Sequence, residues 1–302
     1  MKAPDQFRDE LTRLKSEPRR AIHSFHRYFG KLIPAIPAAA ISAYTSPGDL
    51  VVDGFAGSGT TLVEARETHR NSVGLDLNPL ATLVSRVKTT PIDSARLADA
   101  YSQVIRTLDG ISPADARATI PYVVNIDHWF RADVLETLLR LRVAIDTLED
   151  HDSLNFLRAC LSAFIRGVSN ADPRHVFPGY SKRMRALDEA GREIDVLKSF
   201  ERAFRKRAKA LAELNHHGGN AAPVNDSARN IGRYAGEAEL AVINPPYISS
   251  IRYLETMKIE MGWLDVVKSR SEYLEMDRTM LGTERFYKAD LAAIQASGIP
   301  EV

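Results

Sequence analysis

Two short segments of the sequence combine residue types that could perform chemistry. Residues 53–61 read DGFAGSGTT and residues 244–247 read NPPY, and each segment follows a short apolar run. Glycines in a turn after a strand let the backbone approach a ligand closely, and the N-terminus of the next helix attracts a carboxylate or another negative group. Alone, the first segment also fits a structural turn. Asp76 lies about 20 residues further on, where an acid can accept hydrogen bonds from ribose hydroxyls, so the pair favours a cofactor that contains a nucleoside.

The NPPY segment indicates what is bound beside that cofactor. Its two prolines fix φ and remove two backbone donors, which makes the loop stiff. The side-chain carbonyl of Asn244 and the main-chain carbonyl of Pro245 then form a pair of acceptors for both hydrogens of an amino group. This arrangement leaves the lone pair of that nitrogen directed at an electrophilic methyl group, and Tyr247 offers an aromatic face for a planar base. A rigid turn at a strand end is the alternative, and the glycine-rich turn upstream makes the binding site the favoured interpretation.

Short strands and crossover helices must position these two segments. The pattern predicts strands at residues 49–53 and 71–76, and further strands at 222–225 and 240–243. A helix is expected from about Thr60, and Asn78 and Pro79 fit the N-cap and first-turn positions of the next one. Strands that alternate with helices in this way are typical of a parallel sheet.

Between about residues 93 and 214 the apolar residues instead recur at spacings of three and four, which predicts amphipathic helices packed on one another. The fold class is therefore α/β, with a Rossmann-like sheet and a helical insertion between its second and third strands. We expect residues 1–92 and 220–302 to form the two parts of the α/β domain and residues 93–219 to form the insertion. Within the last part, the segment 253–267 is expected to be helical.

Composition limits the classes of protein that fit. The net charge is +1, so a surface for nucleic acid has to be a local patch. The single cysteine, Cys160, excludes an intramolecular disulfide and suits a reducing cytoplasm. The sequence contains neither a run long enough to span a membrane nor an N-terminal signal peptide, and no cluster of metal-ligating residues.

DGFAGSGTT and NPPY together resemble motifs I and IV of the DNA amino-methyltransferases, which methylate N6 of adenine or N4 of cytosine. Residues 74–79 (GLDLNP) and 224–229 (VNDSAR) resemble the second and third motifs of that family, and residues 27–37 resemble its motif X. The resemblance implies S-adenosyl-L-methionine as the cofactor and double-stranded DNA as the partner. It also implies that a flipped-out base enters a pocket beside the methyl donor and receives the methyl group directly.

The same resemblance implies roles for individual residues. Asp76 would hold the ribose of the cofactor, and Asp226 would face its adenine amino group. The implied cofactor contacts are Tyr28, Lys31, Pro34, Asp53, Phe55, Ala56, Gly57, Ser58, Gly59, Thr60, Asp76, Leu77 and Asp226. The residues implied to bind the target base and promote transfer are Asn244, Pro245, Pro246 and Tyr247.

Several alternatives remain at this point. Asn at position 244 favours adenine over cytosine, and NPPY also resembles loops of methyltransferases that act on rRNA guanine or protein glutamine, whereas GSGTT favours DNA. Methylation of cytosine C5 would need a thiolate nucleophile. The only candidate is Cys160, which lies in an apolar helical stripe and is expected to be part of the core.

The pattern predicts fewer strands than the family sheet usually has. We therefore expect a sheet that is incomplete at its C-terminal side and is completed by a second polypeptide, in preference to strands too weak to recognise. A non-catalytic subunit that binds cofactor or DNA and completes a partner methyltransferase is the alternative function. The intact NPPY segment favours activity.

One local patch could contact a nucleic acid. In residues 169–185 (SNADPRHVFPGYSKRMR), four cations alternate with Phe177 and Tyr180. Cations suit phosphates and aromatic rings suit displaced bases, although an ordinary solvated loop fits this segment equally well. Arg252 and Tyr253, just after NPPY, are further candidates for the base pocket.

Overall fold

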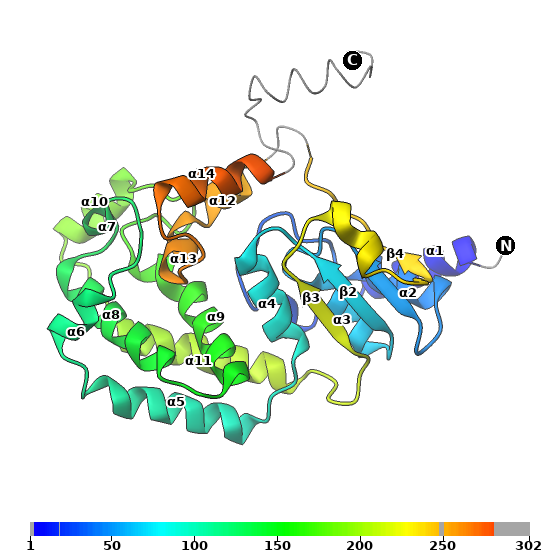
Figure 1. Ribbon diagram of the computed structural model, residues 1–302, viewed down its shortest axis with the longest axis horizontal. Helices are drawn as coiled ribbons and strands as arrows, with labels where there is room; N and C mark the ends of the chain where they lie inside the picture. Colours follow the sequence, from blue (N-terminus) through cyan, green and yellow to red (C-terminus); the bar gives the residue numbers. More distant parts are fainter. Residues whose placement is uncertain (1–2, 18, 248–250, 281–302) are drawn as a thin grey trace, which may run out of the picture.

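The computed structural model describes residues 3–17, 19–247 and 251–280, and it places a parallel sheet beside a larger group of helices (Figure 1). The sheet contains four strands among the described residues, in the order β3-β2-β1-β4. These are β1 (Leu50–Asp53), β2 (Asn71–Leu75), β3 (Ala221–Val224) and β4 (Leu240–Ala241). The chain is thus an α/β protein, and all four strands lie at or within a residue or two of their expected positions.

All strand pairs are parallel, so the carboxyl ends of the strands share one edge of the sheet. Asp53 at the end of β1 is opposite Gly74 of β2, and Leu75 is opposite Val224 of β3. The loops that follow β1, β2 and β4 therefore leave the sheet on the same side. This edge is where open α/β sheets bind their ligands.

The fourth strand is shorter than expected. The pattern predicts residues 240–243, but β4 ends at Ala241 and Ile243 is 56% exposed. The last hydrogen bond between β4 and its neighbour β1 joins Val242 N to Val52 O at 2.9 Å. Because β1 ends at Asp53 and continues into the glycine-rich loop, the residues of the described chain that follow Val242 do not pair with β1.

Four helices accompany the sheet: α1 (Ala3–Lys15), α2 (Ala35–Tyr44), α3 (Thr60–Glu67) and α4 (Pro79–Thr89). Helix α3 begins at Thr60 as expected. Asn78 is the N-cap of α4, its side chain accepts a hydrogen bond from Leu80 N at 3.0 Å, and Pro79 occupies the first turn. The predicted capping of this helix is confirmed.

The segment between β2 and β3 continues from α4 into a helical group (Figure 1). The apolar core of this group extends to Val63 of α3 and Val87 of α4. Phe156, Phe200 and Leu138 are fully buried at its centre, and Cys160 lies among them. The helices of this group are α5 (Ser94–Leu108), α6 (Pro113–Ala118), α7 (Ile126–Trp129), α8 (Ala132–Asp146), α9 (His151–Val168), α10 (Lys182–Glu189) and α11 (Val196–Ala212). Short 3-10 helices lie at Ala21–Ser24 (η1) and Ala228–Arg233 (η2).

The prediction of one helix over residues 253–267 is wrong in detail. The structure has two short helices, α12 (Tyr253–Thr256) and α13 (Lys258–Trp263), followed by α14 (Arg270–Thr279). The break falls at Met257, whose φ of −123° is not helical. Leu254 packs with α4, whereas Trp263 packs in the core of the helical group, so the segment buries side chains on two sides.

These helices return the chain from the sheet to the helical group, and the division into three parts at residues 92 and 219 stays a prediction. The expectation that the end of the chain adds no strand falls mostly on residues 281–302, outside the described residues. Among the helices that the structure describes, none has the length and apolar character needed to cross a membrane.

Candidate functional site

The loop after β1 is organised by Asp53. Its Oδ1 accepts a hydrogen bond from Phe55 N at 2.9 Å, and its Oδ2 accepts one from the hydroxyl of Thr61 at 2.6 Å. The side chain is 4% exposed, and burial raises the pKa of its carboxyl to about 6, although both hydrogen bonds favour the charged form. Asp53 therefore closes the turn and joins it to the first turn of α3.

Two glycines of this loop are required by its geometry. Gly57 and Gly59 have φ values of 51° and 72°, in the left-handed region that other residues adopt at a cost. A Cβ at position 59 would lie 2.2 Å from Ser85 Oγ on α4, and one at position 57 would lie 3.2 Å from the ring of Tyr28. The loop is thus packed closely between α4 and the segment around Tyr28.

Asp76 connects the loops after β1 and β2. Its Oδ2 accepts a hydrogen bond from Gly57 N at 2.9 Å, and its Oδ1 accepts one from Asn78 N at 2.8 Å. Burial raises the pKa of this carboxyl to about 6. Each carboxylate oxygen can accept a second hydrogen bond, so the side chain retains the capacity to bind a pair of hydroxyls.

Lys88 is a site residue that sequence reasoning did not identify. Its Nζ donates a hydrogen bond to the main-chain carbonyl of Ser58 at 2.6 Å, and its side chain is 1% exposed. Burial lowers the pKa of the ammonium group to about 7. A lysine in the apolar pattern of helix α4 was a signal for this role, because a buried ammonium group needs a polar partner.

The NPPY loop meets the segment around Gly30. Asn244 Nδ2 donates a hydrogen bond to the main-chain carbonyl of Gly30 at 3.3 Å. Gly30 itself has a φ of 69°, and a Cβ there would lie 2.7 Å from the hydroxyl of Tyr253. The rings of Tyr253 and Tyr28 are stacked with centroids 6.5 Å apart. Three segments far apart in the sequence are therefore assembled beside the glycine-rich turn.

One cavity lies between these segments. Twelve of the expected site residues line it: Tyr28, Lys31, Asp53, Phe55, Ala56, Gly57, Ser58, Thr60, Asp76, Leu77, Asn244 and Pro246. Its other lining residues are Phe29, Gly30, Leu32, Gly54, Thr61, Asn78, Ser227, Ala228, Tyr253 and Met280. Most of these are sequence neighbours of expected residues, and Tyr253 is one of the two further candidates for the base pocket; Arg252 instead lines a separate groove with Trp129 and Tyr273.

Five expected residues do not line this cavity: Pro34, Gly59, Asp226, Pro245 and Tyr247. Gly59 acts through the turn, as described above. The carboxylate of Asp226 accepts hydrogen bonds from Ser227 N (2.7 Å), Asn230 Nδ2 (2.8 Å) and the hydroxyl of Tyr234 (2.8 Å), which hold its pKa below the usual range. Tyr247 is 69% exposed, on the loop whose Asn244 and Pro246 line the cavity. Their roles toward cofactor and base stay predictions.

The cavity has the chemistry that a charged nucleoside cofactor needs. Two carboxylates, that of the buried Asp53 and that of the half-buried Asp76, line it together with aromatic rings. Among the residues that the structure describes, the buried hydroxyl oxygen of Ser58 has no hydrogen-bond partner, although Ser58 lines the cavity. Carboxylates can accept hydrogen bonds from ribose hydroxyls or an ammonium group, and an unpaired buried hydroxyl requires a polar partner. The residues present therefore fit such a group.

Comparison with known proteins agrees with this geometry. The model of a family described as DNA methylase (N6_N4_Mtase) matches residues 11–83, which contain the glycine-rich turn and Asp76. The type II methyltransferase M.MvaI of Kocuria varians is 25% identical over 289 residues, covering 89% of this chain and 63% of that protein. The type II methyltransferase M.MjaII of Methanocaldococcus jannaschii is 36% identical over 83 residues, covering 28% of this chain and 16% of that protein. No solved structure matches the chain.

The chain is thus similar to the N6- and N4-directed DNA amino-methyltransferases, through the family match over residues 11–83 and through both type II methyltransferases. That family uses S-adenosyl-L-methionine. The chain spans 63% of the length of one curated relative and 16% of the other.

Proposed function

We propose that this chain transfers the methyl group of S-adenosyl-L-methionine to an exocyclic amino group of a base in double-stranded DNA. The observation that carries the proposal is the cavity, which is lined by Asp76, the glycine-rich turn and Asn244 together. A nucleoside cofactor bound at Asp76 and an amino group bound at Asn244 would then lie in the same cavity, as direct transfer requires.

The cofactor part of the site is built from this chain's own backbone and carboxylates. The bound cofactor supplies a methyl group on a positively charged sulfur. Asp76 accepts hydrogen bonds from its ribose hydroxyls, and the loop at 54–59 wraps around it because Gly57 and Gly59 allow the tight turn. Lys88 donates a hydrogen bond to the carbonyl of Ser58 and so helps to hold that loop in place.

The target part of the site positions an amino group. The Oδ1 atom of Asn244 and the carbonyl of Pro245 accept its two hydrogens, which directs the nitrogen lone pair at the methyl carbon. In the transfer, the nitrogen lone pair would form the new N–C bond as the C–S bond breaks, the electron pair of that bond would stay on sulfur as a thioether, and the extra proton on nitrogen would pass to water. Tyr247, exposed on the same loop, stacks on the flipped base.

Of the two possible amino groups, N6 of adenine is the one that Asn at position 244 favours, with N4 of cytosine as the alternative. Both relatives carry the name type II methyltransferase, which supports a role in a restriction–modification system. The comparisons give no support for a second polypeptide that supplies further strands of the sheet.

The experiment that tests the proposal offers labelled S-adenosyl-L-methionine to the chain with DNA, RNA and protein acceptors in parallel. We expect label in DNA alone. Label that enters only RNA or protein would assign the chain to another acceptor class, and binding of cofactor without transfer to any acceptor would favour the non-catalytic subunit.

A further inference from the structure

The loop between α9 and α10, residues 169–181, presents an apolar tip to solvent. Residues 173–177 are all exposed, whereas Pro178 behind them is buried. Phe177 is 43% exposed and its neighbour Val176 is 38% exposed. Two adjacent large apolar side chains at a loop tip carry a cost in water, which a binding partner could remove.

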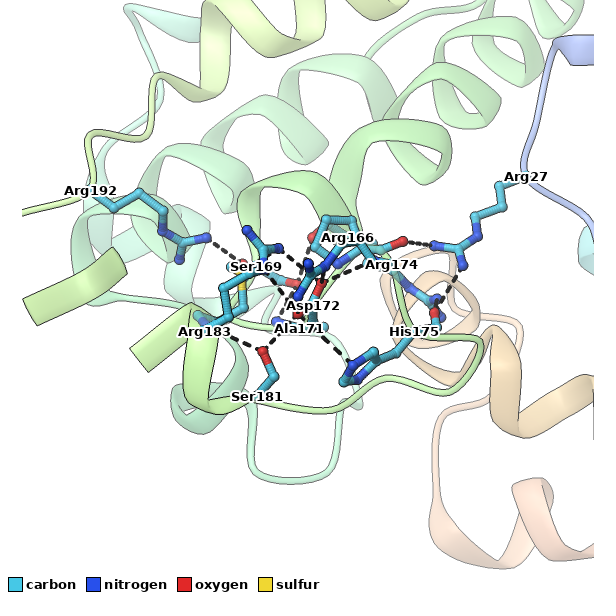
Figure 2. A network of polar contacts seen from close by, with 12 residues as sticks. Arg27, Arg166, Ser169, Ala171, Asp172, Arg174, His175, Ser181, Arg183 and Arg192 are labelled. Carbon is cyan, nitrogen blue, oxygen red and sulfur yellow. Dashed lines mark hydrogen bonds and ion pairs between the residues drawn. The ribbon is translucent and has the colours of Figure 1, made fainter. Parts of the chain in front are cut away.

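Asp172 fixes the base of this loop. Its side chain is fully buried, and its carboxylate accepts hydrogen bonds from the Ser181 hydroxyl (2.7 Å), Arg183 Nη2 (2.9 Å) and Arg174 Nη2 (3.1 Å) (Figure 2). The guanidinium groups of Arg183 and Arg174 hold the pKa of Asp172 far below its usual range. The main-chain N–H of Asp172 also donates to Gly179 O at 2.8 Å, which closes the loop. The loop is thus tied at both of its ends.

Two further arginines hold the tip from outside (Figure 2). Arg27 donates to the carbonyls of Pro173 and His175, the latter at 2.9 Å. Arg166, which forms a buried ion pair with Glu260 at 3.3 Å, donates to the carbonyl of Val176 at 3.2 Å. The backbone of the tip is therefore held in place, because the main-chain carbonyls of Pro173, His175 and Val176 accept hydrogen bonds from arginines outside the loop.

These arginines also connect the tip to the cavity. Arg27 precedes Tyr28, which lines the cavity. Arg166 donates to the carbonyl of Thr256 in α12, the helix that contributes Tyr253 to the cavity. Both arginines thus join the loop that carries Phe177 to segments that line the cavity.

The surroundings of the tip are cationic. Residues 169–185 contain four arginines and lysines against one aspartate, in a chain of net charge +1. Arg174 and Arg183 bind Asp172 yet stay 63% and 38% exposed, so each can also contact an external anion. Arg185 lies over the ring of Tyr180, 5.2 Å from its centroid. Positive charge around an apolar tip fits a DNA duplex, in which phosphates flank stacked bases.

We propose that Phe177 is a wedge that enters the base stack of the DNA beside the target nucleotide and stabilises the flipped-out base. The cations of residues 174–185 hold the flanking phosphates while it does so. This inference rests on the proposed methylation of DNA. Apolar side chains inserted between base steps offset the loss of stacking, and the cost of flipping is smallest for a base that is already unpaired.

The test compares Phe177→Ala with Leu187→Ala, a matched change at an exposed apolar residue (39%) of α10. Each variant methylates two duplexes that contain the site modified by the original chain, one fully paired and one with the target base in a mismatch. We expect Phe177→Ala to lower the rate on the paired duplex by about tenfold or more and on the mismatched duplex by no more than about twofold. Phe177→Leu should recover most of the rate, and Leu187→Ala should behave like the original chain on both.

An equal rate of Phe177→Ala and the original chain on the paired duplex would overturn the inference. So would an equal loss on paired and mismatched duplexes, because a contact unrelated to flipping would act on both. Both outcomes can be observed only if the original chain methylates DNA. If it methylates only RNA or protein, the proposed function is wrong, and this result differs from a failure of the wedge inference.

Discussion

The side-chain amide of Asn244 donates a hydrogen bond to the main-chain carbonyl of Gly30, at 3.3 Å, across 214 positions of sequence. Only the amide nitrogen can donate to a carbonyl, so this bond fixes the orientation of the amide and directs Oδ1 away from Gly30. The acceptor proposed to bind the target amino group is thus oriented by the segment that also lines the cofactor cavity. In the proposed reaction, this contact would couple the positions of base and methyl donor.

Replacing Asn244 should separate catalysis from cofactor binding. We expect Asn244→Ala to reduce methyl transfer by about two orders of magnitude or more, because it removes an acceptor that acts on the reacting nitrogen. Cofactor affinity, measured by calorimetry, should change little. Asn155→Ala on α9, away from the cavity lining, is the matched control. Turnover of Asn244→Ala at the rate of the original chain would remove the assigned role.

A pair of glycines tests the geometry of the cofactor turn. Gly59 and Gly191 have similar φ values of 72° and 77°, but a Cβ at 59 would lie 2.2 Å from Ser85 Oγ whereas one at 191 meets nothing within 4 Å. Gly191→Ala should cost about 1–2 kcal/mol of unfolding free energy from its backbone conformation alone. Gly59→Ala should cost more and should also weaken cofactor binding. Equal stability and equal cofactor affinity of the two variants would contradict this packing.

Cofactor binding should depend on pH through Asp76. Burial raises the pKa of this carboxyl to about 6, and ribose hydroxyls need its ionised form as acceptor. Affinity should therefore be constant above about pH 7 and should fall below pH 6, with a slope approaching about tenfold per pH unit for one linked proton.

Asp76→Asn provides the control for that profile. It should bind the cofactor more weakly and with a flatter pH dependence, and any remaining slope would come from Asp53, whose pKa is also raised to about 6. A profile of Asp76→Asn that is parallel to that of the original chain would assign the titration to another group.

Cys160 should be dispensable for transfer. It is fully buried in α9, and burial raises the pKa of its thiol to about 12, so it is not a nucleophile at neutral pH. Cys160→Ala should retain the methylation rate at a cost of about 1 kcal/mol in stability from the lost sulfur atom. Loss of activity in a variant that still folds and binds cofactor would instead point to thiolate chemistry.

The sequence was sufficient to predict the elements whose signals are local. Asp53, Asp76 and Asn244 each follow a short apolar run, and parallel strands bring such positions to one edge, so their meeting in one cavity could be expected. The N-cap at Asn78 was predictable for the same reason, because capping depends on neighbouring residues.

Features that depend on tertiary contacts could not be predicted. The length of β4 depends on where its neighbour β1 turns away, and the break at Met257 depends on which side each apolar residue is buried. Lys88 supports the glycine-rich loop, and Gly30 lies close to Tyr253. Local sequence patterns do not indicate that these residues lie near one another in space. The cations and aromatic residues of the loop at 169–181 are evident in the sequence. The hydrogen bonds from Arg27 and Arg166 to its main chain are evident only in the structure.

The identity of the modified nucleoside tests the central proposal most directly. DNA treated with this chain and S-adenosyl-L-methionine would be digested to nucleosides and analysed by mass spectrometry, with Asn244→Ala in parallel. We predict N6-methyladenine or N4-methylcytosine with the original chain and almost none with the variant, since both nucleosides carry the methyl group on an exocyclic nitrogen. 5-Methylcytosine, or equal yields from the two proteins, would contradict the account.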